Sequence, residues 1–297
     1  MCTESALVLG GGGVAGIAWT TGVLAGLAEA GVDATAADLL LGTSAGSTVA
    51  AQLGSGLPVA ELYRRQVDPA LQNAELAPPP GAMAALMEQL AKFQLEVPDP
   101  LLRRQLMGEA ALAADTVPEA VRRAVIEARL PVHTWPERRL AITAVDARSG
   151  EIRIFDRESG VALVDAVAAS CAVPGIWPPV TAGGSRYVDG GVRTSNNADL
   201  VAGCGRVLVI APWNDPALEA ELAVLAEHGR VEVVIPDEGA LEAFGADPLA
   251  PTTRTPSARE GRRQGLAAAG RTAPLFPAPT AGDRAGTDIP EGEGTVG

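Results

Sequence analysis

The chain is poor in histidine, cysteine and lysine, and each shortage excludes a class of function. Lys92 is the only lysine, and the formal net charge of the 297 residues is −13. A protein without a Lys/Arg-rich stripe cannot neutralise nucleic-acid phosphates, so we expect no nucleic-acid partner. Cys2, Cys171 and Cys204 form an odd set without CxxC spacing. This set indicates neither a disulfide framework nor a zinc site, and we expect a reduced, cytoplasmic location.

Charge is also missing from the first part of the chain. Residues 5–28 hold no charged residue and seven glycines, and the first basic residue is Arg64. A signal peptide needs a positive n-region, and a membrane span does not tolerate so many glycines, so we expect neither. The same lack of positive charge argues against anchoring on anionic lipid. We therefore expect membrane contact to be apolar and at most transient.

The N-terminal part alternates apolar runs with helical segments. Residues 5–9 predict a buried strand, a glycine run follows, and residues 16–30 predict a helix that Gly31 can cap. Residues 38–41 predict a second strand and residues 45–53 a second helix. Two successive strand-turn-helix units are typical of a parallel sheet with helices packed on it. The predicted class is therefore α/β.

The rest of the chain is first helical and then rich in strands. Residues 59–130 predict helices, the last of which begins at a capping box formed by Thr116 and Glu119. Further strands are predicted at residues 139–145, 151–155, 186–188, 206–210 and 231–235, the first two as a hairpin. From residue 271 onward, Pro, Gly, Ala and Thr lack periodicity. We therefore predict one domain over residues 1–270 and a disordered tail over 271–297.

A GxSxG pentapeptide, Gly42-Thr43-Ser44-Ala45-Gly46, lies between the second predicted strand and helix. A nucleophilic serine needs such a tight turn, which exposes its hydroxyl, and flanking glycines avoid the clash that side chains would make. The N-terminus of the helix adds N–H groups and a dipole that favour a developing anion. Ser44 is therefore the predicted nucleophile. The competing interpretation is a glycine-rich turn with an incidental serine.

A second glycine-rich turn, residues 10–13, follows the first predicted strand and contains GxGxxG from Gly11 to Gly16. A dinucleotide site would need an acidic residue at the end of the second strand, and the serine turn occupies that place. The other interpretation is an oxyanion hole made by the N–H groups of Gly11, Gly12 and Gly13. The adjacent serine turn favours this second interpretation.

A serine nucleophile needs a base, and the chain offers only two histidines. His133 lies in a connector before a strand, and His228 ends a predicted helix, where it would serve the helix dipole. Asp189 ends a short predicted strand, and Gly190 and Gly191 allow the chain to turn closely after it. Asp189 is therefore the remaining candidate base, although a DGG sequence alone is also typical of a plain turn.

Taken in order, four blocks of this sequence resemble the patatin-like phospholipase family. They are Gly11-Gly12-Gly13 with Gly16, then Gly42-Thr43-Ser44-Ala45-Gly46, Ala169-Ser170-Cys171-Ala172-Val173-Pro174 and Asp189-Gly190-Gly191. The resemblance spans about residues 5–210. It implies a three-layer α/β fold with a mainly parallel sheet, and a hydrolase of lipid or other acyl esters that needs no cofactor or metal.

The same resemblance implies roles for individual residues. Ser44 would be the nucleophile, Asp189 its partner in a catalytic dyad, and Gly11 to Gly13 the oxyanion hole. The residues that would support these motifs are Gly16, Gly42, Gly46, Pro174, Gly190 and Gly191. One departure concerns Ala15, where the family usually carries Arg or Lys. The missing charge puts catalytic efficiency, or a preference for charged phospholipid, in question.

Three other functions stay open at this stage. An α/β-hydrolase triad of Ser44, Asp189 and His228 has the right chain order, but that fold normally places more strands before the serine turn. A catalytically weak acyltransferase is a further alternative. In a nucleotide-binding α/β module the glycine loops would bind phosphate, and the lack of an acidic ribose ligand disfavours that function.

An apolar stripe marks the predicted helix at residues 81–97, where the spacing is helical. Its members are Met83, Leu86, Met87, Leu90 and Phe93. The stripe can pack into the core, as apolar stripes usually do. It can also belong to a mobile cap over Ser44, with methionines that adapt to different acyl chains.

Overall fold

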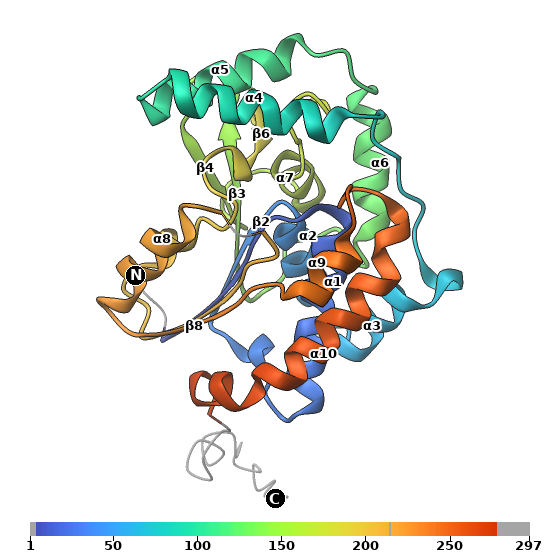
Figure 1. Ribbon diagram of the computed structural model, residues 1–297, viewed down its shortest axis with the longest axis vertical. Helices are drawn as coiled ribbons and strands as arrows, with labels where there is room; N and C mark the ends of the chain where they lie inside the picture. Colours follow the sequence, from blue (N-terminus) through green and yellow to red (C-terminus); the bar gives the residue numbers. More distant parts are fainter. Residues whose placement is uncertain (1–3, 214, 278–297) are drawn as a thin grey trace, which may run out of the picture.

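The computed structural model describes residues 4–213 and 215–277, and this part of the chain forms one eight-stranded sheet (Figure 1). The strands are β1 (Ser5–Leu9), β2 (Leu39–Thr43), β3 (Arg139–Asp146), β4 (Ile152–Phe155), β5 (Val180–Ala182), β6 (Ser185–Asp189), β7 (Arg206–Ile210) and β8 (Arg230–Val234). Their order is β5-β6-β3-β2-β1-β7-β8, with β4 also paired to β3. Strands β1, β2, β3, β7 and β8 are parallel, and β4, β5 and β6 join antiparallel. The predicted mainly parallel sheet is confirmed.

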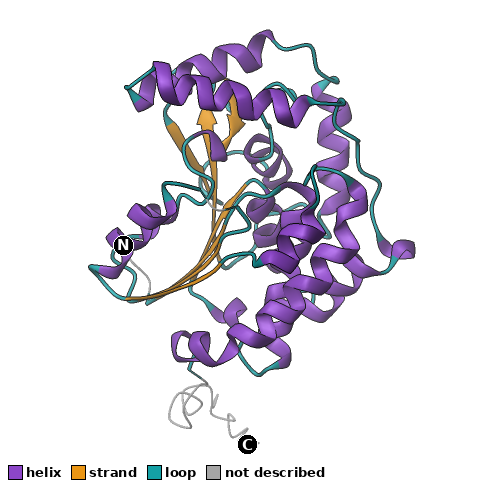
Figure 2. Ribbon diagram, in the orientation of Figure 1, coloured by secondary structure: helices purple, strands orange, loops and turns teal. Residues whose placement is uncertain are grey.

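Helices cover both faces of this sheet (Figure 2). The α-helices are α1 (Gly13–Glu29), α2 (Ala45–Leu53), α3 (Val59–Val67), α4 (Ala82–Glu96), α5 (Pro100–Ala113), α6 (Glu119–Arg129), α7 (Leu163–Ser170), α8 (Leu218–Ala226), α9 (Glu238–Phe244) and α10 (Arg254–Thr272). Short 3-10 segments are η1 (Ala34–Ala36), η2 (Pro69–Leu71), η3 (Gly190–Val192), η4 (Ala198–Val201), η5 (Pro251–Thr253) and η6 (Ala273–Leu275). Figure 1 shows α4 and α5 side by side across one end of the sheet.

Strand β1 shows why the fold has three layers. Successive side chains of a strand point to opposite faces of a sheet. Leu7 and Leu9 belong to the large apolar cluster with α1, α2 and α7, whereas Ala6 and Val8 belong to the cluster with α8. A strand buried on both faces needs the continuous apolar run that the sequence has here.

The pairing of β3 brings two distant segments end to end. Thr43, the last residue of β2, pairs with Thr143, and Asp189, the last residue of β6, pairs with the next residue, Ala144. Because β4 pairs with residues 142–145, it occupies the opposite edge of β3, and β2 and β6 share the other edge. The register therefore places Ser44, which follows β2, next to Asp189.

Helices α1 and α10 pack backbone to backbone through glycines. A Cβ atom on Gly22 would lie 2.2 Å from the carbonyl oxygen of Ala258, and one on Gly261 would lie 2.1 Å from that of Trp19. Gly26 and Gly265 make equally close contacts with the facing helix. Larger residues at these positions would force the two helices apart.

Two expectations at helix ends need correction. Thr116 does not cap α6, because the N-cap residue is Pro118 and no side chain bonds to the helix N-terminus. Glu119 instead accepts hydrogen bonds from the N–H and hydroxyl of Thr181. The boundary at residue 271 is also wrong, since α10 continues to Thr272 and the following turn buries Leu275 completely. The rest of the predicted tail, residues 278–297, lies outside the described residues, as does Cys2.

Candidate active site

Ser44 lies on a strained turn between β2 and α2. Its φ is 52° and its ψ −115°, a conformation that residues with a side chain rarely adopt. The turn leaves no room beside it: a Cβ atom on Gly42 would lie 2.6 Å from Ser47 Cα, and one on Gly46 would lie 1.9 Å from the Leu9 carbonyl oxygen. The two glycines of the GxSxG pentapeptide are thus required by close approach, as a nucleophile elbow demands.

The segment after α7 holds this turn in place. The Ser44 N–H donates a hydrogen bond to Ser170 Oγ at 2.8 Å, and Cys171 Sγ donates one to the Ser44 carbonyl oxygen at 3.3 Å. The Asp189 N–H donates to the carbonyl oxygen of Ala172 at 2.9 Å. The third sequence block therefore connects the serine turn to the aspartate, a role that its sequence did not reveal.

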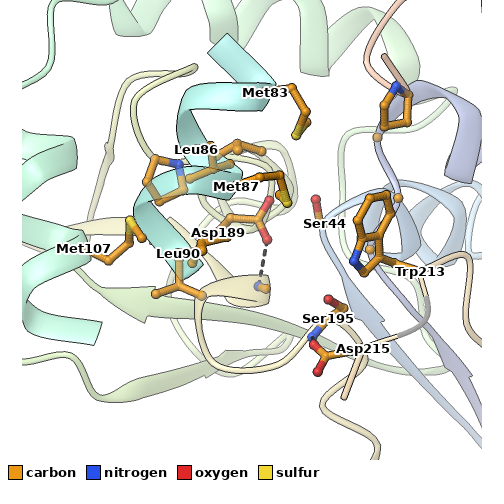
Figure 3. Close-up of a pocket in the computed structure, with 18 of the residues that line it drawn as sticks. Ser44, Met83, Leu86, Met87, Leu90, Met107, Asp189, Ser195, Trp213 and Asp215 are labelled. Carbon is orange, nitrogen blue, oxygen red and sulfur yellow. Dashed lines mark hydrogen bonds between the residues drawn. The ribbon is translucent and has the colours of Figure 1, made fainter. Parts of the chain in front are cut away.

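Asp189 is buried at the end of β6, with 5% of its surface exposed. Its Oδ1 accepts a hydrogen bond from the Gly191 N–H at 2.7 Å (Figure 3), while its Oδ2 has no hydrogen-bond partner in the described part of the chain. A side chain at Gly190 would lie 2.3 Å from Thr143 Oγ1. Both glycines of the DGG sequence therefore serve the aspartate, one as a donor and one by allowing close approach.

The environment of Asp189 makes it a stronger base than a free aspartate. Burial raises the pKa of its carboxyl from 3.8 to about 6, against the opposing effects of the Ser44 hydroxyl, the Gly191 N–H and the positive charge of Arg122. Ser44 is therefore close enough to act on this pKa, yet the pair does not meet the geometry of a hydrogen bond. Apo catalytic pairs are often long or poorly aligned in this way.

The glycine loop after β1 reaches the same place, but Gly11 does not offer its N–H. That group donates a 2.7 Å hydrogen bond to the carbonyl oxygen of Ser195, whose own N–H is held by Asp215. No acceptor for the N–H of Gly12 or Gly13 occurs among the residues described, and these two begin helix α1. Of the predicted trio of donors, the Gly11 N–H is thus already occupied by Ser195, far away in sequence, and Gly12 and Gly13 remain candidates.

Gly16 lies one turn into α1 and joins the two glycine-rich turns. Its N–H donates to the Gly12 carbonyl oxygen at 2.8 Å, and a Cβ atom there would lie 3.3 Å from that of Ala45. The adjacent Ala15 is fully buried and donates its N–H to the Pro248 carbonyl oxygen. A long basic side chain at position 15 would have no space in this packing.

A pocket of about 330 Å³ opens above Ser44 and Asp189, and Pro174 forms part of its wall. In the view of Figure 3, Met87 of α4 and Trp213 lie on opposite sides of Ser44. Clefts of this volume with mostly apolar walls are typical sites for small ligands.

Helix α4 supplies much of the apolar wall of this pocket. Met83, Leu86, Met87 and Leu90 line it, and Leu86 alone of the stripe is buried. Met87 and Leu90 are 38% and 37% exposed. The stripe therefore faces the pocket and not the main core, and its mobility stays a prediction.

Neither histidine lies in this pocket. His228 is exposed beyond the end of α8, and its backbone N–H donates to the Leu225 carbonyl oxygen. His133 is exposed beside Glu127, whose carbonyl oxygen lies 3.1 Å from His133 Nε2. The triad interpretation therefore has no histidine near Ser44.

Arg122, which the sequence did not single out, is buried beside the serine turn. It projects from α6, stacks over Trp177 at 4.0 Å, and lines a small cavity together with Ser44. Its Nε and Nη1 have no hydrogen-bond partner in the part of the chain that the structure describes. Burial and the nearby charge of Arg129 lower the pKa of Arg122 to about 10, so it is still charged at neutral pH. This cation therefore contributes positive potential behind Ser44 and Asp189.

Comparison with known proteins gives one family match and several similar solved structures. The family model described as patatin-like phospholipase matches residues 7–202, well over half of the chain. No curated protein matches the sequence. Among solved structures, VipD from Legionella pneumophila is 14% identical with a TM-score of 0.47, over 91% of this chain and 67% of VipD. The type III effector ExoU is 18% identical with a TM-score of 0.41, over 91% of this chain and 53% of ExoU.

The family match, together with a mainly parallel sheet that carries a serine elbow and a neighbouring aspartate, defines the class of protein. The chain belongs to the patatin-like phospholipase family, a family of lipid acyl hydrolases. It spans about half the length of ExoU. No helix in the described ranges is long and apolar enough to cross a bilayer.

Proposed function

We propose that the chain is a serine acyl hydrolase that cleaves lipid acyl esters through a Ser44–Asp189 dyad. The observation that carries this proposal is the meeting of β2 and β6 on one edge of β3. It brings a strained serine and a buried carboxylate with a free oxygen to the floor of one apolar pocket. Strain and a raised pKa at the same point are typical of a catalytic centre.

The first step of the reaction is attack by Ser44 on the ester. Its Oγ adds to the carbonyl carbon while Asp189 Oδ2 takes the hydroxyl proton. An aspartate with a pKa of about 6 is ionised at neutral pH and close to the optimum for a general base. The proton then passes from Asp189 to the departing alcohol, which leaves an acyl group on Ser44.

The negative charge of the tetrahedral intermediate needs donors that are already in position. The N–H groups of Gly12 and Gly13 meet this requirement, because both are without an acceptor and both lie at the N-terminus of α1, where the helix dipole favours an anion. A water molecule, activated by Asp189 in the same way, then hydrolyses the acyl-enzyme.

Labelling with a fluorophosphonate tests this proposal, since the reagent reacts only with an activated serine. A nucleotide-binding module, the alternative from the sequence, would not be labelled. The wild-type protein should be labelled and should hydrolyse p-nitrophenyl esters, and Ser44→Ala should do neither. His228→Ala should match the wild type within about 2-fold, because that side chain is exposed and remote from the pocket. Asp189→Asn should abolish the esterase activity. If a folded His228→Ala variant lost as much activity as Asp189→Asn, a triad would have to replace the dyad.

A further inference from the structure

A second cavity adjoins the pocket above Ser44. Its volume is about 100 Å³, and three arginines line it: Arg103, Arg104 and Arg193. The two cavities share the side chains of Leu90, Gln94, Met107, Val192 and Arg193. The two cavities are therefore adjacent.

Two of the three arginines are held by the protein in ways that leave donors free, whereas both Nη atoms of Arg193 already bond to Asn197 and Asp199. Arg103 donates from Nη1 to the Val97 carbonyl oxygen at 2.8 Å, and Arg104 donates from Nε to that of Gly150 at 2.6 Å. The Nη2 atom of Arg103 and both Nη atoms of Arg104 make no hydrogen bond to any described residue. These guanidinium groups are fixed at one point and retain unused N–H donors.

The positive charge in this cavity is only partly balanced. Arg193 is paired with Asp199, but no carboxylate from the described residues lines the cavity itself. Asp99 acts on Arg104 from outside, while its Oδ1 caps α5 by accepting the Leu101 N–H. Burial, and then the like charges of Arg193 and Arg103, lower the pKa of Arg104. Three convergent cations are unexpected in a chain with a net charge of −13.

We propose that the arginine cavity is an anion subsite, which binds a phosphate group of the substrate while its acyl ester lies at Ser44. A guanidinium group matches phosphate oxygens in geometry and charge. A bound phosphate group would also offset the mutual repulsion of the three arginines. The inference rests on the proposed function and names the residues of this chain that would select an acyl ester with a phosphate group over a neutral one. Arg103 and Arg104 of α5 would thus supply positive charge to the site, whereas Ala15 of the glycine loop supplies none.

A matched pair of substrates tests the subsite. Hexanoyl lysophosphatidic acid and monohexanoylglycerol carry the same acyl ester and differ only in the phosphate. The wild-type protein should have a kcat/KM about 10-fold or more higher for the phosphate ester, which is the scale of one charge-assisted hydrogen bond. Arg104→Gln and Arg103→Gln should each raise KM for the phosphate ester about 10-fold and change the neutral ester less than about 2-fold.

Arg259→Gln provides the matched control. It removes the same charge from the exposed face of α10, outside both cavities, and should leave the preference unchanged. Circular dichroism and thermal unfolding confirm that each variant is folded. Equal kcat/KM values for the two esters in the wild type, or a parallel loss on both in Arg104→Gln, would overturn the subsite and leave the hydrolase proposal standing.

Binding to Ser44→Ala separates the subsite from catalysis. Calorimetry should show hexanoyl lysophosphatidic acid bound about 10-fold tighter than monohexanoylglycerol, and the added Arg104→Gln change should remove the difference. If inorganic phosphate binds as tightly as the phosphate ester, the cavity is a site for free phosphate and the proposal is wrong. If the wild type neither takes the fluorophosphonate nor hydrolyses any ester, the proposed function fails, and calorimetry still decides on the subsite.

Discussion

Asp189→Asn should inactivate the protein and at the same time stabilise it at neutral pH. The raised pKa of Asp189, about 6 in the folded chain against 3.8 when exposed, means that folding disfavours its charged form. Two pKa units correspond to about 3 kcal/mol of folding free energy. This penalty is present above pH 6, where the carboxyl is charged in both states, and disappears below pH 4, where it is neutral in both. Asparagine has no charge to bury and keeps an oxygen that can accept the Gly191 N–H.

Denaturant unfolding at several pH values measures this effect. By the same linkage, the gain in stability of Asp189→Asn over the wild type should grow by roughly 1.4 kcal/mol between pH 5 and pH 8. Both pH values lie above the isoelectric point of the chain, which is about 4.7. The pH profile of kcat/KM for the wild type should show activity rising through a pKa of about 6, since the base must be ionised.

Ser44→Ala is the control, because it is equally inactive but keeps the buried charge. It should show no gain in stability at pH 8, since the hydroxyl that favours the ionised carboxylate is lost. If Asp189→Asn is less stable than the wild type at pH 8, or if the difference does not change with pH, the carboxyl does not carry a burial penalty. The argument that burial makes Asp189 a suitable base would then be refuted.

Three further changes test other parts of the site. Gly12→Ala should lower kcat by roughly 10²-fold, because its Cβ would lie 2.6 Å from Pro212 Cβ and displace an oxyanion donor; an effect confined to KM in steady-state kinetics would point to a blocked pocket instead. Arg122→Met should move the acid limb of the kcat/KM profile above pH 6, because the positive charge of Arg122 lowers the pKa of Asp189 and its removal raises that pKa; an unchanged profile would show that Arg122 only packs. Met87→Asp should reduce turnover of long-chain esters by about 10-fold or more and that of short-chain esters far less, with the melting temperature nearly unchanged; a parallel loss at all chain lengths with a lower melting temperature would show that α4 is part of the core.

Local patterns in the sequence were sufficient for most of the sheet and for singling out Ser44 and Asp189 as candidates. Strand β7 occupies its predicted residues, 206–210, because an apolar run of this short length between turn residues favours a strand buried on both faces. Ser44 and Asp189 were found through glycines that flank them, and the structure explains these glycines by close approach of neighbouring backbone. Short-range signals of this kind are visible without knowledge of the fold.

Features that depend on distant partners were not predictable. The N–H of Gly11 is occupied by Ser195, and nothing in the glycine run indicates that contact. The arginine cavity combines residues of α5 with Arg193, which are far apart in sequence. The capping box at Thr116 failed because the N-cap of α6 is Pro118, so the helix begins later than the box implies. The tail was predicted to begin at residue 271, inside α10, because the last turn of that helix is rich in small residues. Burial, which sets the pKa of Asp189, is likewise a property of the assembled fold.

The backbone contact between α1 and α10 sets the minimum length of a working fragment. The recognisable family segment ends at residue 202, yet α10 begins at Arg254 and its glycines fit directly against α1, whose first turn presents Gly12 and Gly13. Between them, Pro248 holds the start of α1 by accepting the Ala15 N–H. A fragment cut at the end of the family segment would keep Ser44 and Asp189 but leave α1 without its support. We therefore expect a folded fragment to need residues up to at least Leu275, well past the segment by which the family is recognised.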